Sequence, residues 1–210
     1  MSVLLDDEDA LFDSGSFTLI HNGTVYHVDP TIFFNFSRKF ASMFQYVTNN
    51  PQIDEETGEK LDQCIILPED NYSEDAFATY VEACQMKPIA PSGIILVDIL
   101  VIAEDWDSPT LISKIELLLS TVVSPNELVR LFAKILKENK RSVRIENIIT
   151  TNLPRFIEAP LFSTLPFEVI ERMIGGYQGK LTPAQLIKLC YAASAQGGMN
   201  SMKFVKRYSF

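Results

Sequence analysis

Two histidines, three cysteines and several adjacent acidic pairs are the side chains with which this chain could build an active site. His21 and His27 lie six residues apart, with the dipeptide Asn22-Gly23 between them. No cysteine, aspartate or third histidine stands near them at the spacing of metal ligands. We therefore expect no metal site, and histidines that face solvent or lie at a strand edge.

The cysteines Cys64, Cys84 and Cys190 are odd in number and far apart in the sequence. This arrangement fits neither a disulfide framework nor a metal-binding motif. Because each cysteine has apolar neighbours, we expect buried thiols rather than nucleophiles.

Patterns typical of catalysis do not occur elsewhere in the sequence either. There is no Gly-x-Ser-x-Gly, no Gly-x-Gly-x-x-Gly and no phosphate-binding P-loop pattern. The pairs Glu69-Asp70 and Glu104-Asp105 fall at the ends of expected elements, where solvated caps are the simpler interpretation. The sequence thus predicts no catalytic residue, no cofactor and no metal, and an enzyme of unknown type is kept only as a residual alternative.

Composition describes a globular protein that is acidic overall. The 210 residues suffice for one large or two small domains, and 47% are hydrophobic against 21% charged. The net charge of −9 opposes non-specific binding to nucleic acid or anionic lipid, so neither is expected as a partner. Acidic residues are concentrated in a leader at residues 1–14 and in a loop at 54–59. A basic group is interpreted as a helix end that meets water: Lys137, Lys140, Arg141 and Arg144.

No segment indicates a membrane or secretory protein. The apolar stretches are shorter than the roughly 20 residues that a bilayer-spanning helix needs. The start of the chain lacks the basic and apolar regions of a signal peptide, so we expect a cytoplasmic or nuclear location.

The elements that must position these side chains begin with strands. Residues 17–20 and 24–28 are predicted to form a hairpin across Asn22-Gly23, a dipeptide that favours tight turns. Asp29-Pro30 then begins a short helix, and a longer one follows. Its apolar face is predicted to comprise Phe36, Phe40, Met43, Phe44 and Val47.

Helices dominate the rest of the chain after a buried strand at residues 64–67. Ser73, Ser92 and Ser108 each mark a helix start, and the helix after Ser92 is apolar almost all round and should be buried. Beyond Val123 the pattern is helical only, so we place a domain boundary near Val122. Strands early and helices late predict an α+β protein.

With these elements in place, the first part of the chain resembles the BTB/POZ domain. The segment YHVDPTIFFNFSRKFASMF, residues 26–44, aligns without a gap to a family pattern close to F-x-A-H-K-x-V-L-A-A-R-S-x-x-F-x-x-M-F. The segment starting SPNELVRLFAKIL at Ser124 resembles the BACK domain, the helical module that follows many BTB domains. Together the similar stretches cover roughly residues 15 to 190.

After the acidic leader at residues 1–14, the resemblance implies a BTB/POZ fold at 15–122 (a short β-sheet with a helical cluster) and a small all-α BACK-like domain at 123–210. It implies a non-enzymatic scaffold protein that binds protein partners and self-associates as a homodimer. The candidate self-association surface comprises Ile32, Phe33 and Phe34. An alternative is a substrate adaptor that joins a partner to the cullin of a cullin-RING ubiquitin ligase, with a cullin-side surface of Tyr80, Gln85 and Met86.

Three departures from the family pattern affect these expectations. The Tyr-x-Tyr-Thr-Gly run, part of which touches cullin in ubiquitin-ligase adaptors, is replaced by residues 83–87, ACQMK, which weakens the expectation of cullin docking. Asp29-Pro30 replaces a His-Lys pair, and Ser16 and Phe36 stand where dimeric transcriptional members have a buried Asp and Arg. A corepressor pocket of that chemistry is therefore not expected. Since Phe36 also belongs to the helical apolar face, we assign it to the core and leave Phe34 as the exposed candidate. The alternative, that Phe34 fills space beneath the hairpin, stays open.

Overall fold

The predicted hairpin is the first element in the described part of the chain. In the computed structural model, which describes residues 17–50, 52–53, 60–61, 63–68, 72–137 and 142–195, β1 (Phe17–His21) pairs antiparallel with β2 (Thr24–Val28). Asn22 and Gly23 have φ values of 48° and 81°. Two consecutive positive φ values are what a two-residue hairpin turn requires, and this explains why Asn-Gly predicted the turn correctly.

A third strand completes the main sheet. β5 (Cys64–Ile66) pairs parallel with β1, which gives the strand order β2-β1-β5. Phe17, Leu19 and Ile65 are buried, while Ile66 is exposed. A separate two-stranded pair consists of β3 (Gln52–Ile53) and β4 (Lys60–Leu61).

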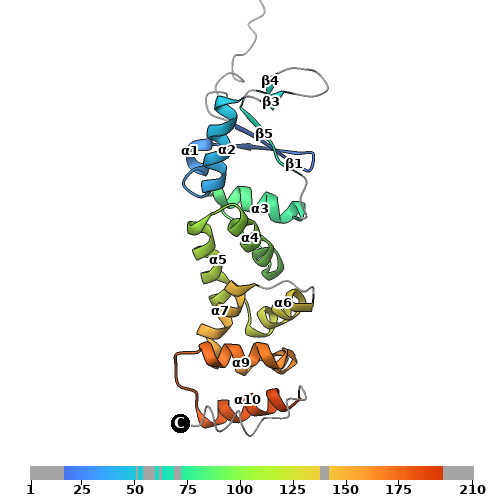
Figure 1. Ribbon diagram of the computed structural model, residues 1–210, viewed down its shortest axis with the longest axis vertical. Helices are drawn as coiled ribbons and strands as arrows, with labels where there is room; N and C mark the ends of the chain where they lie inside the picture. Colours follow the sequence, from blue (N-terminus) through green and yellow to red (C-terminus); the bar gives the residue numbers. More distant parts are fainter. Residues whose placement is uncertain are drawn as a thin grey trace, which may run out of the picture. The chain divides into compact units, whose positions relative to one another are not determined.

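Helices follow and interleave with these strands along the chain (Figure 1). Asp29, Ser73 and Ser92 were predicted as helix starts, whereas the cap at Ser37 was not. Asp29, Ser37, Ser73 and Ser92 each accept a backbone hydrogen bond in the first turn of their helix. The helices are α1 (Pro30–Phe33), α2 (Arg38–Asn49), α3 (Glu74–Cys84), α4 (Gly93–Asp105) and α5 (Pro109–Thr121).

Aromatic rings fill the space between the sheet and the first helices. Phe33 and Phe40 lie 4.5 Å apart between ring centroids, and Phe17 lies 5.8 Å from Phe40. Trp106 is buried against Phe77 and Tyr80, which confirms its predicted role in packing. Phe36 is also buried, as the apolar pattern predicted.

A buried polar group joins α2 to the corner between α4 and α5. The Ser37 hydroxyl donates to the Trp106 carbonyl at 2.7 Å and accepts from the Phe40 N–H at 3.1 Å. The Tyr80 and Ser108 hydroxyls are hydrogen bonded at 2.7 Å. Partnered in this way, these hydroxyls can be buried without the cost of an unsatisfied polar group.

The later helices that the structure describes include an ion pair whose carboxylate is buried and whose guanidinium is partly exposed. Arg172 of α9 holds both carboxylate oxygens of Glu146 of α7, at 2.8 and 2.9 Å. The elements are α6 (Pro125–Lys137), α7 (Val143–Thr151), α8 (Leu153–Ile157), the 3-10 helix η2 (Pro160–Thr164), α9 (Phe167–Gly176) and α10 (Pro183–Ala195).

The chain divides into two compact units, residues 1–114 and 115–210, and the division falls within α5. The α+β class predicted from the sequence is confirmed, since the sheet lies in the first unit and helices make up most of the described chain.

Two details of the fold differ from what the sequence predicted. His21 is buried rather than solvent-facing, because it belongs to the inward-facing set of β1. The α4 helix is not buried all round, since Ile94 and Val101 are exposed.

Candidate protein-interaction surface

The side chains that could do chemistry are dispersed in the structure. His21 stacks on Phe77 with ring centroids 4.0 Å apart, whereas His27 is exposed on β2. Within the described residues, no group of three or more His, Cys, Asp or Glu could hold a metal ion. Cys84 is fully buried, and this burial raises the pKa of its thiol to about 12. A thiol of that pKa is a poor nucleophile at neutral pH.

The three predicted self-association residues, Ile32, Phe33 and Phe34, differ in how far they are buried. Phe33 is fully buried among Phe40, Tyr80 and Trp106, so it belongs to the core and not to a surface. Ile32 is half-buried. Only Phe34 is exposed, with 36% of its surface accessible.

The three predicted cullin-side residues also have different environments. Tyr80 is fully buried, and its hydroxyl bonds to Ser108, so it cannot be part of a surface. Gln85 is partly exposed at the C-terminal cap of α3. Met86 follows it with 71% of its surface exposed and a left-handed φ of 61°.

A shallow groove of about 410 Å³ runs along α2 beside Phe34. The Phe34 ring lies 5.0 Å from that of Phe44 and 5.5 Å from that of Phe40, so it extends the aromatic core outward to the groove. We call this surface the α2 groove, and its lining residues are Phe34, Ala41, Phe44, Gln45, Thr48 and Asn49.

The α2 groove carries no ionisable side chain. Residues 40–53 contain no Asp, Glu, Lys or Arg, although these make up 21% of the whole chain. Exposed positions of α2 such as Ser42, Gln45 and Asn49 are polar but neutral. Exposed Tyr46 adds an aromatic side chain on another flank of the helix. Depletion of charge with enrichment of aromatic residues is the composition typical of the centre of a protein interface.

Sequence reasoning found Phe34 but missed the rest of the groove. Phe44 was assigned to the core face of α2, and it is in fact only half-buried. Ala41, Gln45, Thr48 and Asn49 drew no attention because none is apolar and large. The signal that could have found them is the absence of charged residues from positions 40–49, that is, from α2 after its first two residues, Arg38 and Lys39.

A second shallow groove lies in the second unit. Its lining includes Phe162 of η2 together with Tyr191 and Lys188 of α10. The Lys188 ammonium pairs with the Glu158 carboxylate, so charges at this groove are already matched. It lacks the neutral composition of the α2 groove.

Comparison with known proteins does not extend this description. No family model matches the chain, and no curated protein is similar to it. No helix in the described part of the chain combines the length and the apolar character needed to cross a membrane.

Proposed function

We propose that the chain is a non-enzymatic protein-interaction module that self-associates through the α2 groove, with a BTB/POZ-type first domain and a BACK-like helical second domain. The order of elements supports this assignment. A hairpin, a short helix, a longer helix, a strand and further helices occur in the order of the motifs on which the family resemblance rests. The observation that carries the proposal is the lining of the α2 groove, which is partly aromatic and has no charged side chain.

The net charge of the chain explains why such a surface suits self-association. Two copies with a net charge of −9 repel each other, and direct contact between like charges at an interface costs further free energy. A groove without ionisable groups avoids the second cost. Apolar contact around Phe34 and Phe44 then supplies the favourable free energy.

The proposal is tested by placing a charge in the groove without disturbing the core. Gln45 is exposed on α2, so Gln45→Glu should leave the fold intact while opposing dimerisation. We expect the dimer dissociation constant, measured by light scattering over a concentration series, to rise by about tenfold or more. Phe34→Asp should abolish the dimer outright, although it also removes ring contacts with Phe40 and Phe44.

Met86→Glu is the matched control. It adds the same negative charge at an exposed apolar residue of the same unit that does not line the groove. We expect the dimer to be unaffected by this change. Equal dissociation constants for Gln45→Glu and Met86→Glu would refute the α2 groove as the interface.

The adaptor function is the second candidate, and exposed Met86 is the observation that favours it. An apolar side chain that is 71% exposed at the end of α3 could anchor a partner protein. If this function holds, purified cullin should be retained by the immobilised chain, and Met86→Glu should reduce retention. Failure to retain any purified cullin would exclude it, without bearing on self-association.

A further inference from the structure

Charge is divided unevenly between the two compact units. Residues 1–114 carry 20 acidic and five basic side chains, a net charge of −15. Residues 115–210 carry seven acidic and 13 basic side chains, a net charge of +6. The acidic character of the whole chain therefore conceals a basic second unit.

Several basic side chains of the second unit have partners within it. Arg144 pairs with Glu116 at 3.0 Å, and Arg172 pairs with Glu146. Among the residues that the structure describes, Lys188 also pairs with Glu158, and Arg155 donates to the carbonyls of Ser120 and Val123. These contacts already pair the four cations within the unit, so these side chains are less able to bind a partner protein.

Helix α6 differs from this pattern. Arg130, Lys134 and Lys137 are all exposed, and their spacing of four and three residues places them on one face. The same spacing places Glu127 at the N-terminal end of that face, where it offsets one of the three positive charges. The opposite face is buried through Leu128 and Phe132, among others. The ion pairs found among the described residues of this unit do not include the three basic side chains. We call them the α6 stripe.

We propose that the α6 stripe is a docking surface for an acidic segment of a partner protein. The three charges lie along about 10 Å of helix, which is close to the screening length at physiological salt. A short run of carboxylates can therefore interact with all three at once. Complementary charge of this kind steers association and selects the partner.

An acidic protein segment fits the molecule better than nucleic acid does. Double-stranded DNA carries a charge about every 1.7 Å over its whole length, so it would also meet the repulsion of a chain with 27 acidic side chains. A short acidic segment presents only a few charges and can be accommodated locally. The proposal is independent of the α2 groove, because it rests on a different unit and on the opposite kind of surface.

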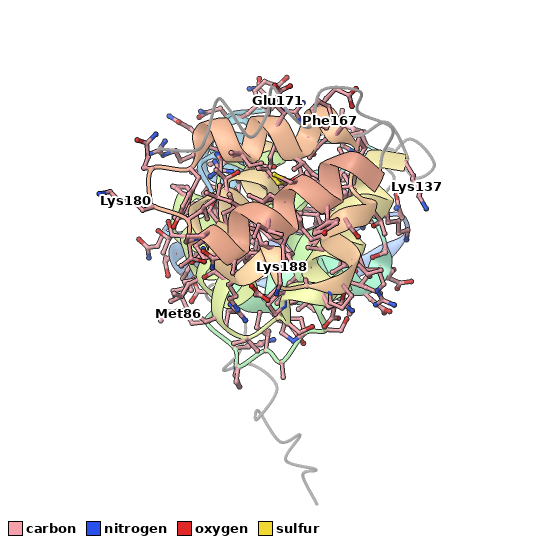
Figure 2. All side chains as sticks on the ribbon, turned by 90° about the horizontal axis from the view of Figure 1, so that it is seen from below. Met86, Lys137, Phe167, Glu171, Lys180 and Lys188 are labelled. Carbon is pink, nitrogen blue, oxygen red and sulfur yellow. The ribbon has the colours of Figure 1, made fainter. Side chains whose placement is uncertain are left out.

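The test measures binding of a fluorescein-labelled peptide of ten glutamates to the full chain by fluorescence anisotropy. Single substitutions Arg130→Glu, Lys134→Glu and Lys137→Glu should each lower the affinity about two- to fivefold. Lys180→Glu is the matched control, since Lys180 is an exposed cation of the same unit. Figure 2 shows the Lys137 and Lys180 side chains projecting outward on opposite sides of that unit. The control should leave the affinity unchanged.

Salt and a competing polyanion complete the experiment. Raising NaCl from 50 to 200 mM should weaken peptide binding to the unmodified chain, because the contact is electrostatic. Equal losses for Lys180→Glu and the stripe variants, or no binding at all, would overturn the proposal. Tighter binding of a DNA oligonucleotide with ten phosphates would also overturn it. So would a change in the oligomeric mass in solution that the stripe variants cause and Lys180→Glu does not, because it would identify a second copy of the chain as the occupant.

Discussion

Phe33 and Phe34 are neighbours in sequence, yet one is fully buried and the other is exposed. A helical backbone turns about 100° per residue, so adjacent side chains face different surroundings. Phe33 points into the aromatic core, while Phe34 lies at its outer edge against Phe44. Sequence reasoning treated them as one surface, and only the three-dimensional path of the short α1 helix separates them.

The cysteines offer a prediction at the same scale. Burial raises the pKa of all three thiols, and that of Cys84 to about 12. At pH 8 about one Cys84 thiol in ten thousand would be ionised, so its reaction with N-ethylmaleimide should be negligible while the protein is folded. Cys190 is only half-buried and should react first.

Peptide mapping by mass spectrometry measures these rates. In denaturant all three cysteines should react at similar rates, which serves as the control. Modification of Cys84 as fast as Cys190 in the folded protein would contradict the buried position of Cys84.

The ion pair between Arg172 and Glu146 should contribute more to the free energy of unfolding than the more exposed pair between Arg144 and Glu116. The Glu146 side chain is only 9% exposed, so Arg172→Ala would leave a buried carboxylate without its guanidinium partner. We expect this change to lower the free energy of unfolding by about 1 to 2 kcal/mol, measured by urea denaturation.

Arg144→Ala is the matched comparison for that prediction. Arg144 and Glu116 are 39% and 33% exposed, so water already screens their attraction. The expected cost is about 0 to 1 kcal/mol. A larger loss for Arg144→Ala than for Arg172→Ala would contradict the burial argument.

Among the elements, α2 begins at a capping residue, Ser37, that also makes a hydrogen bond outside its own helix. Ser37 is fully buried, accepts from the Phe40 N–H and also donates to the Trp106 carbonyl. Ser73 begins α3 in the same way, but it is exposed and bonds only to the Ala76 N–H among the contacts seen. Ser37→Ala should therefore cost about 2 kcal/mol of unfolding free energy and Ser73→Ala about 1 kcal/mol.

Thermal and urea denaturation of the two variants would check this order. Equal losses would mean that the bond from Ser37 to Trp106 contributes nothing to stability. Circular dichroism of both variants provides the control, since each should keep the helical content of the unmodified chain.

Local sequence signals predicted the positions of most helices and strands. They did not predict which side chains of those elements are buried and which form a surface. Asn22-Gly23, Asp29-Pro30 and the capping serines act on their immediate neighbours, so the sequence alone located the hairpin and the helix starts. The burial of His21 depends on which face of β1 meets Phe77, a contact across 56 residues. The groove residues Ala41 and Gln45 become a surface only when α1 places Phe34 beside α2. Such long-range placement leaves no periodic pattern in the sequence.

At the scale of the whole molecule, the two surfaces should respond to salt in opposite directions. The α6 stripe depends on charge attraction, so added salt should weaken what it binds. The α2 groove is neutral, and the repulsion between two chains of net charge −9 is what opposes its association. Screening that repulsion should strengthen the dimer.

Sedimentation equilibrium of the unmodified chain at 50 and 300 mM NaCl tests the central claim most directly. We expect a species of twice the chain mass at micromolar concentrations, with a dissociation constant that falls as salt is raised. A monomer at every concentration and salt, or a dimer that dissociates as salt is raised, would contradict self-association through the α2 groove.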